Sequence, residues 1–256
     1  MTVRTAPAFG RTALSKVPEV TLAFWVVKVL ATTVGETAAD GLDSALGLGL
    51  TGTALVMSAL LVAALGVQLT CRSYVPAVYW VVVVLVSVVG TLVTDQLVDG
   101  LGVSLRTTTA GFAVALAAVF AAWWASERTL SIHTVTSGRR EAWYWLAILV
   151  TFALGTAAGD LLAEGLHLGY AVSAVLFAAC LAAVWVAHAR LGLGAVLAFW
   201  TAYVLTRPLG ASLGDLLSQE RSAGGLGLGT TLTSAAFLLV IVAVVVHLTR
   251  HREDAS

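Results

Sequence analysis

Long apolar runs recur along this chain and leave few alternatives for its fold. A helix that crosses a bilayer needs about 20 mostly apolar residues, because it rises about 1.5 Å per residue and satisfies its backbone hydrogen bonds internally. Of the 256 residues, 59% are hydrophobic and only 11% are charged, whereas soluble proteins are about one-quarter charged. We therefore predict an all-α integral membrane protein with eight transmembrane helices, at residues 20–42, 46–70, 76–97, 105–125, 142–164, 168–189, 194–217 and 226–249.

The Lys and Arg residues outside these spans gather on one side of the predicted bilayer. Ten of them lie in the two tails and the even-numbered connections, against only Arg106 and Arg221 on the other side. Cytoplasmic connections are enriched in Lys and Arg, so we predict that both termini are cytoplasmic. The predicted parts are a tail over residues 1–18, one transmembrane domain over 19–250 and a tail over 251–256.

Acidic residues show the opposite bias and lie at the outer ends of the spans. The outer mouth of the protein is therefore expected to be acidic. The formal net charge is zero and no basic patch is interleaved with aromatic residues, so the lipid bilayer and a small cation are predicted partners and nucleic acid is not. These acidic residues are Asp40, Asp43, Asp95, Asp99, Asp160, Glu164, Asp215 and Glu220.

A 17-residue pattern occurs four times without a gap, as FWVVKVLATTVGETAAD, YWVVVVLVSVVGTLVTD, YWLAILVTFALGTAAGD and FWTAYVLTRPLGASLGD. Each copy has an aromatic residue, a Trp, nine residues, a Gly, four residues and an Asp. The shared residues are Trp25, Trp80, Trp145 and Trp200, then Gly35, Gly90, Gly155 and Gly210, and finally Asp40, Asp95, Asp160 and Asp215.

The chain is therefore predicted to consist of four tandem two-helix repeats, at about 19–74, 75–138, 139–193 and 194–250. Because two spans return the chain to the same side, every repeat enters the membrane in the same direction. The expected symmetry is a pseudo-rotation about the membrane normal. Four repeats can form a pseudo-fourfold ring or pair as two halves, with the first helix of each repeat inside.

These repeats resemble a family of uncharacterised bacterial membrane proteins with four tandem repeats, each with two spans and a characteristic Trp. The segments KVPEVTLAFWVVKVLATTVGETAAD, REAWYWLAILVTFALGTAAGD and LTRPLGASLGDLL carry the resemblance most clearly, and it extends over residues 16–250. The resemblance implies the eight-helix architecture and a multi-pass protein of the bacterial inner (plasma) membrane. It implies no particular activity.

Polar residues of the first helices share one helix face. Each residue advances about 100° along a helix, so the positions seven, eleven and fifteen after the Trp lie within about 80° of one another. The Asp lies about 22 Å from the Trp at about 1.5 Å per residue, in the outer third of the bilayer. We expect this face to line the bundle interior. It carries Thr32, Ser87, Phe152 and Arg207, then Glu36, Thr91, Thr156 and Ala211, and then the four Asp.

The Gly, Trp and Asp residues that all four repeats share can each be interpreted separately. The Gly flanks the polar face, where a missing side chain lets a neighbouring helix approach closely. The Trp is either an anchor at the cytoplasmic interface or a residue that packs in or lines an interior cavity. The Asp could lie in water or cap the following helix, but a carboxylate at a helix C-terminus opposes the macrodipole. Its fourfold recurrence therefore favours an ion-facing role.

Three charges belong to single repeats: Lys28, Glu36 and Arg207. Charges inside a membrane are costly and usually pair. Glu36 is expected to pair with Lys28, two turns below it, or with Arg207 if the ring closes. The pair is either a structural clamp or a cation ligand coupled to a basic group. Pro208 lacks a backbone donor and is expected to kink or break its helix, which would free carbonyls beside the charge.

The predicted function is a secondary transporter or channel for a small cation, with efflux of a divalent metal such as Mn²⁺ as its suggested form. Carboxylate and hydroxyl oxygens suit hard cations. The alternative is a non-transporting scaffold or sensor with structural charges. No nucleophile–base pair, phosphate loop or cofactor motif is visible, so an enzyme is not predicted. The predicted ligands are Asp40, Asp95, Asp160, Asp215, Glu36, Thr32, Thr91 and Thr156, with Lys28 and Arg207 as charge-coupling residues.

Overall fold

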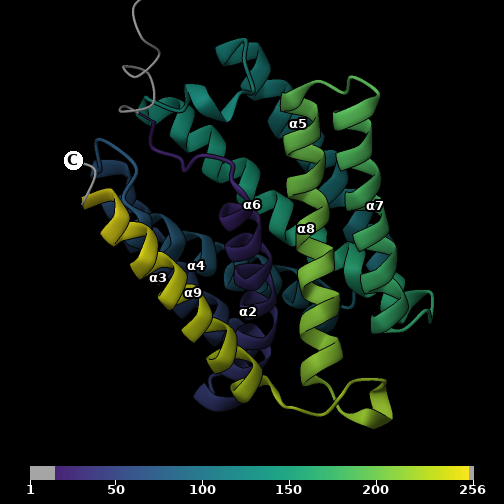
Figure 1. Cartoon of the computed structure of the whole chain (residues 1–256). Helices are drawn as coiled ribbons and strands as arrows, with labels where there is room; N and C mark the ends of the chain where they lie inside the picture. Colours follow the sequence, from purple (N-terminus) through teal and green to yellow (C-terminus); the bar gives the residue numbers. More distant parts are fainter. Residues whose placement is uncertain (1–14, 254–256) are drawn as a thin grey trace, which may run out of the picture.

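The computed structural model describes residues 15–253, and this part of the chain is helical, without a strand (Figure 1). Arg4 and Arg11 of the predicted cytoplasmic tail lie outside it. Short π-helical turns, η1 (Gln96–Gly100) and η3 (Leu161–Gly165), continue the second and third inner helices. The long helices are α2 (Leu22–Leu46), α3 (Gly49–Thr70), α4 (Pro76–Asp95), α5 (Leu105–Glu127), α6 (Gly138–Asp160), α7 (Tyr170–Arg190), α8 (Ala195–Ser218) and α9 (Thr230–Glu253).

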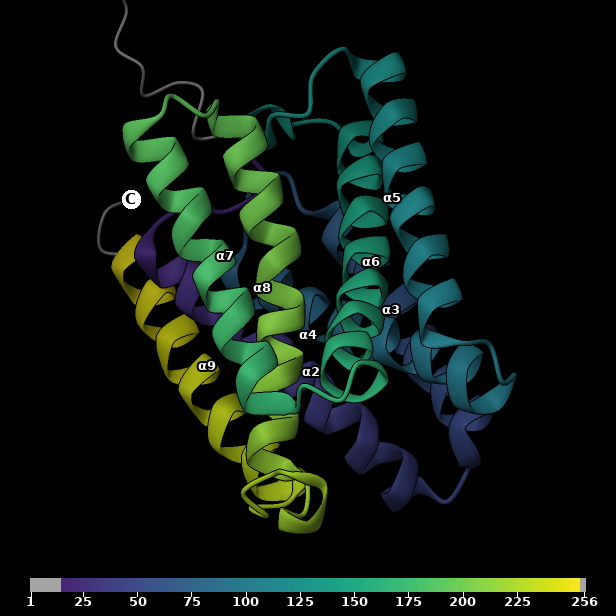
Figure 2. The same cartoon turned by 90° about the vertical axis from the view of Figure 1, so that its right-hand side faces the viewer.

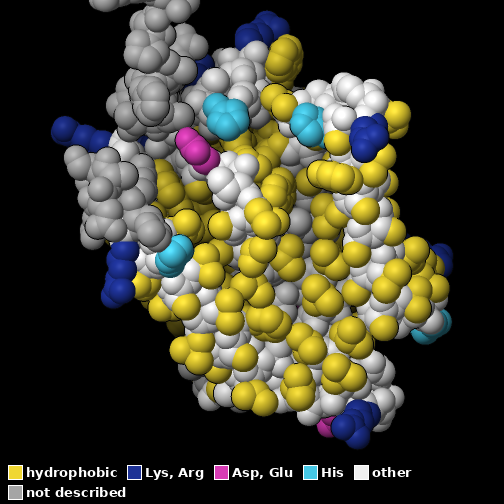
Figure 3. Space-filling model, in the orientation of Figure 1, with side chains coloured by type: hydrophobic (Ala, Val, Ile, Leu, Met, Phe, Trp, Pro, Cys, Tyr) yellow, Lys and Arg dark blue, Asp and Glu magenta, His cyan; other side chains and the backbone are white. Residues whose placement is uncertain are grey.

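Seven of these helices are long and apolar enough to cross a membrane. The remaining one, α8, has 24 residues but is more polar, because it contains Arg207 and Asp215 together with several Gly, Ser and Thr residues. Figure 3 shows apolar side chains over the flank of the molecule and charged side chains at its margins. The prediction of an all-α, multi-pass membrane fold is confirmed.

The first helices of the four repeats form a closed ring. Helix α2 packs against α4, α4 against α6 and α6 against α8, and α8 packs back against α2. Between 56% and 67% of the apolar window is buried in α2, α4 and α6, against 17–22% in α3, α5, α7 and α9. Of the two expected arrangements the ring is the one formed, with the first helices inside.

Each outer helix packs mainly against the next repeat rather than against its own. Helix α3 lies on α4, α5 on α6 and α7 on α8, while α9 returns to lie on α2. Figure 2 shows the pairs α5–α6 and α7–α8 side by side. The two helices that pack together are therefore not the two helices of one sequence repeat, but the second helix of one repeat and the first helix of the next. By the same rule, the last helix of the chain covers the first repeat and stabilises the closed ring.

The two ends of the ring differ and are named here for use below. The aspartate end is the one that carries Asp40, Asp95, Asp160 and Asp215. The terminal end is the opposite one, where α2 begins and α9 ends (Figure 1). An even number of long helices brings both described chain ends to the same side.

The repeated glycines make the ring close-packed. A Cβ atom built on each of them would collide with the residue seven positions after the Trp in the next repeat. Around the ring, each inner helix thus packs one side chain against the bare backbone of the inner helix before it. The ring closes because a side chain of the first repeat packs in the same way against the glycine of the fourth. The contacting pairs are Gly35 with Ser87, Gly90 with Phe152, Gly155 with Arg207 and Gly210 with Thr32.

Pro208 was expected to kink or break its helix, and the break does not occur, since α8 runs without interruption from Ala195 to Ser218. A proline removes only one backbone donor, and here its ring faces the bare backbone of Gly155, where a Cβ would lie 3.0 Å from the Pro208 Cδ. Packing against α6 therefore helps to hold the helix through the proline. No free carbonyls are needed to explain the site below.

We predict that Gly90→Ala destabilises the fold by about 1–3 kcal/mol, the range for overpacking a filled interior. Its Cβ would lie 2.7 Å from the Phe152 Cβ and 3.2 Å from the Ala153 nitrogen. Gly111→Ala is the matched control, since nothing lies within 4 Å of its Cβ position in α5. Thermal unfolding in detergent measures both. Equal stability of the two variants would contradict the interlocked ring.

Candidate functional site

A polar cavity of about 320 Å³ lies on the ring axis at the aspartate end. Each repeat contributes its Asp to the lining, and Glu36 lines it from one helical turn deeper. The fourfold repeat therefore brings its four carboxylates to one place. These are Asp40 from α2, Asp95 from α4, Asp160 from α6 and Asp215 from α8.

Three further polar side chains line the same cavity: Asp99, Glu164 and Gln219. Each lies four residues after the repeated Asp of its own helix. Asp99 and Glu164 were expected at the acidic mouth but not as lining residues, and Gln219 was not predicted. They could have been predicted from their position four residues after the repeated Asp, because residues four apart on a helix lie on the same face.

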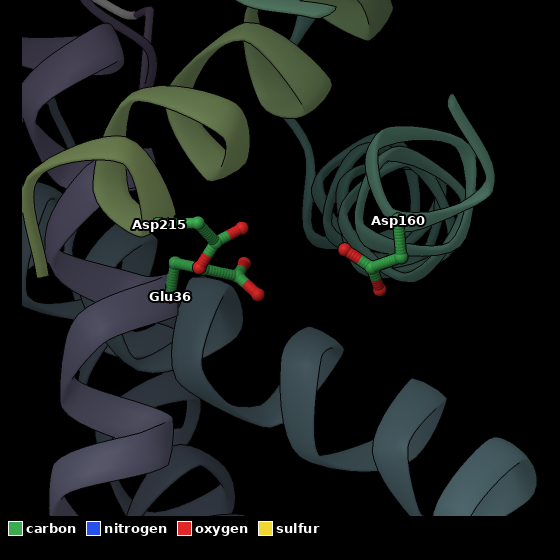
Figure 4. A group of neighbouring side chains, drawn as sticks. All are labelled: Glu36, Asp160 and Asp215. Carbon is green, nitrogen blue, oxygen red and sulfur yellow. The ribbon is translucent and has the colours of Figure 1, made fainter. Parts of the chain in front are cut away.

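Glu36, Asp160 and Asp215 form the tightest group in the cavity. Carboxylate oxygens of these three residues lie within 4.8 Å of one another. Figure 4 shows the side chains projecting from α2, α6 and α8 toward a common point. Three convergent carboxylates have the ligand chemistry of a hard metal cation.

Most of the cavity carboxylates lack a compensating hydrogen bond. Asp215 is only 7% exposed. Within the described part of the chain, no hydrogen bond goes to the carboxylate of Asp95, Asp160 or Asp215, whereas the Asp40 carboxylate accepts one from the Gln219 amide at 3.2 Å. Negative groups at this separation repel one another, and burial makes the repulsion stronger. The arrangement therefore favours a bound cation or shared protons.

The head group of Arg207 is fully buried and contacts the cavity through Glu36, which lines it. It donates to the Glu36 carboxylate at 2.8 Å, to the Thr156 hydroxyl at 2.7 Å and to the Thr91 hydroxyl. It also donates to the Thr32 carbonyl at 3.2 Å. One side chain from α8 thereby connects α2, α4 and α6. Glu36 pairs with Arg207, which is the partner expected for a closed ring.

Lys28 has no such partner and lies among aromatic rings. Its ammonium nitrogen is 4.1 Å from the centre of the Phe152 ring and 4.2 Å from that of Tyr203, and it has no hydrogen-bond partner. The Arg207 guanidinium lies 5.4 Å from the same Phe152 ring. Cation–π contact offsets part of the cost of a buried ammonium. Two basic side chains thus occupy the axis directly below the acidic cavity.

Aromatic residues fill the ring at the terminal end. The residues before the four Trp are all buried, and the Tyr79 and Tyr144 hydroxyls are hydrogen-bonded at 2.6 Å. Trp80, Trp145 and Trp200 are buried as well, while Trp25 is half-buried. In this arrangement the Trp residues pack within the helix bundle. The residues before the Trp are Phe24, Tyr79, Tyr144 and Phe199.

The segment before α2 crosses the same end and is fixed there by polar contacts. The Lys16 ammonium lies 2.6 Å from the Glu141 carboxylate of α6, which also accepts a hydrogen bond from Gln68 of α3 at 2.9 Å. The backbone nitrogen of Tyr74 donates to the Ser15 carbonyl at 2.9 Å. These contacts hold the segment across the terminal end, whereas the acidic cavity lies at the aspartate end.

The whole repeat architecture has a counterpart among known sequences. The chain matches the family model described as Repeat of Unknown Function (DUF347) four times, at residues 23–74, 78–129, 143–192 and 198–254. It belongs to this repeat family. No curated protein and no solved structure is detectably similar to it. The family description specifies no activity, so the function has to be argued from the cavity.

We predict that Glu36→Gln lowers the free energy of unfolding by about 3–5 kcal/mol, because it leaves the buried Arg207 guanidinium without its counterion. The matched control is Glu220→Gln, an exposed carboxylate at the same end of the molecule. Thermal unfolding in detergent measures the difference. If the two variants unfold at the same temperature, the Glu36–Arg207 pair contributes nothing to the fold.

Proposed function

We propose that this member of the DUF347 repeat family is a secondary transporter for small cations. The observation that carries the proposal is the convergence of the four repeated Asp and Glu36 on one cavity at the ring axis. An acidic cavity concentrates cations from the adjoining solution. Binding at the interface between repeats is also the arrangement on which transporters with internal repeats rely.

The ligand chemistry favours a hard divalent cation. Glu36, Asp160 and Asp215 offer three carboxylates within 4.8 Å of one another, and carboxylate oxygens bind Mg²⁺, Ca²⁺ and Mn²⁺ in preference to soft metals. Among the described residues, those that line the cavity include neither His nor Cys, the ligands of softer metals. We propose Mn²⁺ or a similar ion as substrate, with efflux as the direction.

A carrier fits this site better than an open channel. A cation that leaves the cavity along the axis meets Arg207 and then Lys28, and below them the axis is filled by aromatic side chains. The basic groups repel a passing cation, so passage requires that the inner helices rearrange. In the state described here, the cavity lies at the aspartate end.

A non-transporting scaffold or sensor is the second candidate, favoured by the Arg207 contacts. This side chain connects α8 with α2, α4 and α6, which would suffice as a structural clamp. Within the described residues, the carboxylates of Asp95, Asp160 and Asp215 line one cavity without a hydrogen-bond donor, and a scaffold does not account for them. Ion flux distinguishes the two candidates.

We predict that purified protein in liposomes moves Mn²⁺ down an imposed gradient, and that Asp160→Asn and Asp215→Asn each lower the initial rate at least about tenfold, since each removes a charged ligand worth about 1.4 kcal/mol or more. Glu220→Gln is the control, because this carboxylate does not line the cavity. Unchanged flux in both Asn variants would overturn the ligand assignment. The absence of flux for every cation tried would favour the scaffold.

We further propose that the protein lies in a bacterial inner membrane with the terminal end in the cytoplasm, as the distribution of Lys and Arg indicates. In a chain with Cys71→Ser and Cys180→Ser, we predict that a membrane-impermeant maleimide labels Ser222→Cys in intact spheroplasts. Thr136→Cys should react only after permeabilisation. Both positions are exposed, at opposite ends of the bundle. The reverse pattern would invert the orientation.

A further inference from the structure

Four oxygen atoms surround the Arg207 head group, and none of them belongs to the helix that carries it. They are the Glu36 carboxylate and the Thr32 carbonyl on α2, the Thr91 hydroxyl on α4 and the Thr156 hydroxyl on α6. Three helices therefore form a socket, and the fourth inserts a cation into it. Such an oxygen set, with one carboxylate, matches a single positive charge.

Three of the four socket residues occupy the same position in their repeats. Glu36, Thr91 and Thr156 occupy one layer of the ring, eleven residues after the Trp of each repeat. The fourth position of this layer is Ala211, which has no polar group and is fully buried. The head group of Arg207, from one turn below, takes the place that a larger side chain at position 211 would fill.

We propose that the socket of Glu36, Thr32, Thr91 and Thr156 is an inner cation site, one turn below the cavity, which Arg207 occupies as a tethered cation. The proposal deepens the proposed function and rests on it for the route of the substrate. Because Glu36 belongs both to the socket and to the cavity, a substrate cation and the Arg207 head group compete for one carboxylate. Displacement of Arg207 would remove the first of the two basic groups between the cavity and the terminal end.

The contacts of Arg207 support the proposal that its head group can leave the socket. Its hydrogen bonds go through the two terminal nitrogens, while its buried Nε has no acceptor. The Cβ and Cγ of its stem lie against the bare backbone of Gly155. The side chain is thus recognised at its charged end and makes only apolar contact along its stem. A free guanidinium ion carries the recognised part alone.

The test is binding of guanidinium to the purified Arg207→Ala variant, at millimolar concentrations that leave the wild type folded. We expect a saturable rise of several degrees in the unfolding midpoint, because a ligand that binds only the folded state stabilises it. The wild type should show no rise, since its socket is filled. Arg207→Ala combined with Glu36→Gln should show none either, because the socket has lost its charge.

Urea serves as a control because it has a shape similar to guanidinium but no charge. Tetramethylammonium chloride serves as a control because its cation has no N–H donors. Neither compound should raise the unfolding midpoint. An equal rise in the wild type and in Arg207→Ala, or no rise in folded Arg207→Ala, would overturn the inner site. If Arg207→Ala does not fold on its own, cell-free synthesis into liposomes with and without guanidinium replaces the melt. Folded protein that appears only with guanidinium supports the site, and failure under both conditions overturns it.

The binding assay requires no transport, so the two proposals fail separately. Guanidinium binding without Mn²⁺ flux would retain the inner site and remove the transporter. Flux that depends on Asp160 and Asp215, without guanidinium binding, would retain the transporter and reduce Arg207 to a structural clamp.

Discussion

The ion pair between Arg207 and Glu36 is the interaction on which the rest of the structure depends. A charged group inside a membrane protein is costly and is usually paired or hydrogen-bonded. Arg207 meets that condition only when α2, α4 and α6 all surround it, since each supplies at least one acceptor. The pair therefore couples the first repeat to the last and disfavours any arrangement in which the ring is open.

Close packing makes this network possible. The position seven residues after each Trp lies against the Gly of the preceding repeat, and the stem of Arg207 lies in this way on Gly155. Because the bare backbone leaves room for the stem, the head group reaches the axis without displacing a helix. The packing of each outer helix on the next repeat also stabilises ring closure. Helix α9 of the last repeat covers α2 of the first, the helix that Arg207 of α8 contacts through Glu36.

The sequence predicts the inner face well, because a period close to four residues repeats in four aligned copies. It does not predict the packing of the outer helices onto the next repeat, since helices such as α3 and α9 are apolar on every side and contain no directional pattern. It left open whether Glu36 pairs with Lys28 or Arg207, because that choice depends on ring closure. A break at Pro208, one of the two expected effects of this residue, does not occur, since α8 continues through it and its ring packs against the bare backbone of Gly155.

A symmetric ring alone would not be sufficient for the proposed mechanism. Four identical repeats would place the same side chain four times in each layer, so any charged layer would hold four charges of one sign. The chain instead keeps the Asp fourfold, as a ligand set with several equivalent oxygens, and confines Glu36 and Arg207 to single repeats. In the proposed mechanism, the shared layer attracts a cation, and the pair below it offers one carboxylate for which that cation and Arg207 compete. Divergence between the repeats would then supply the difference between a cavity that binds a cation and a site that can release it.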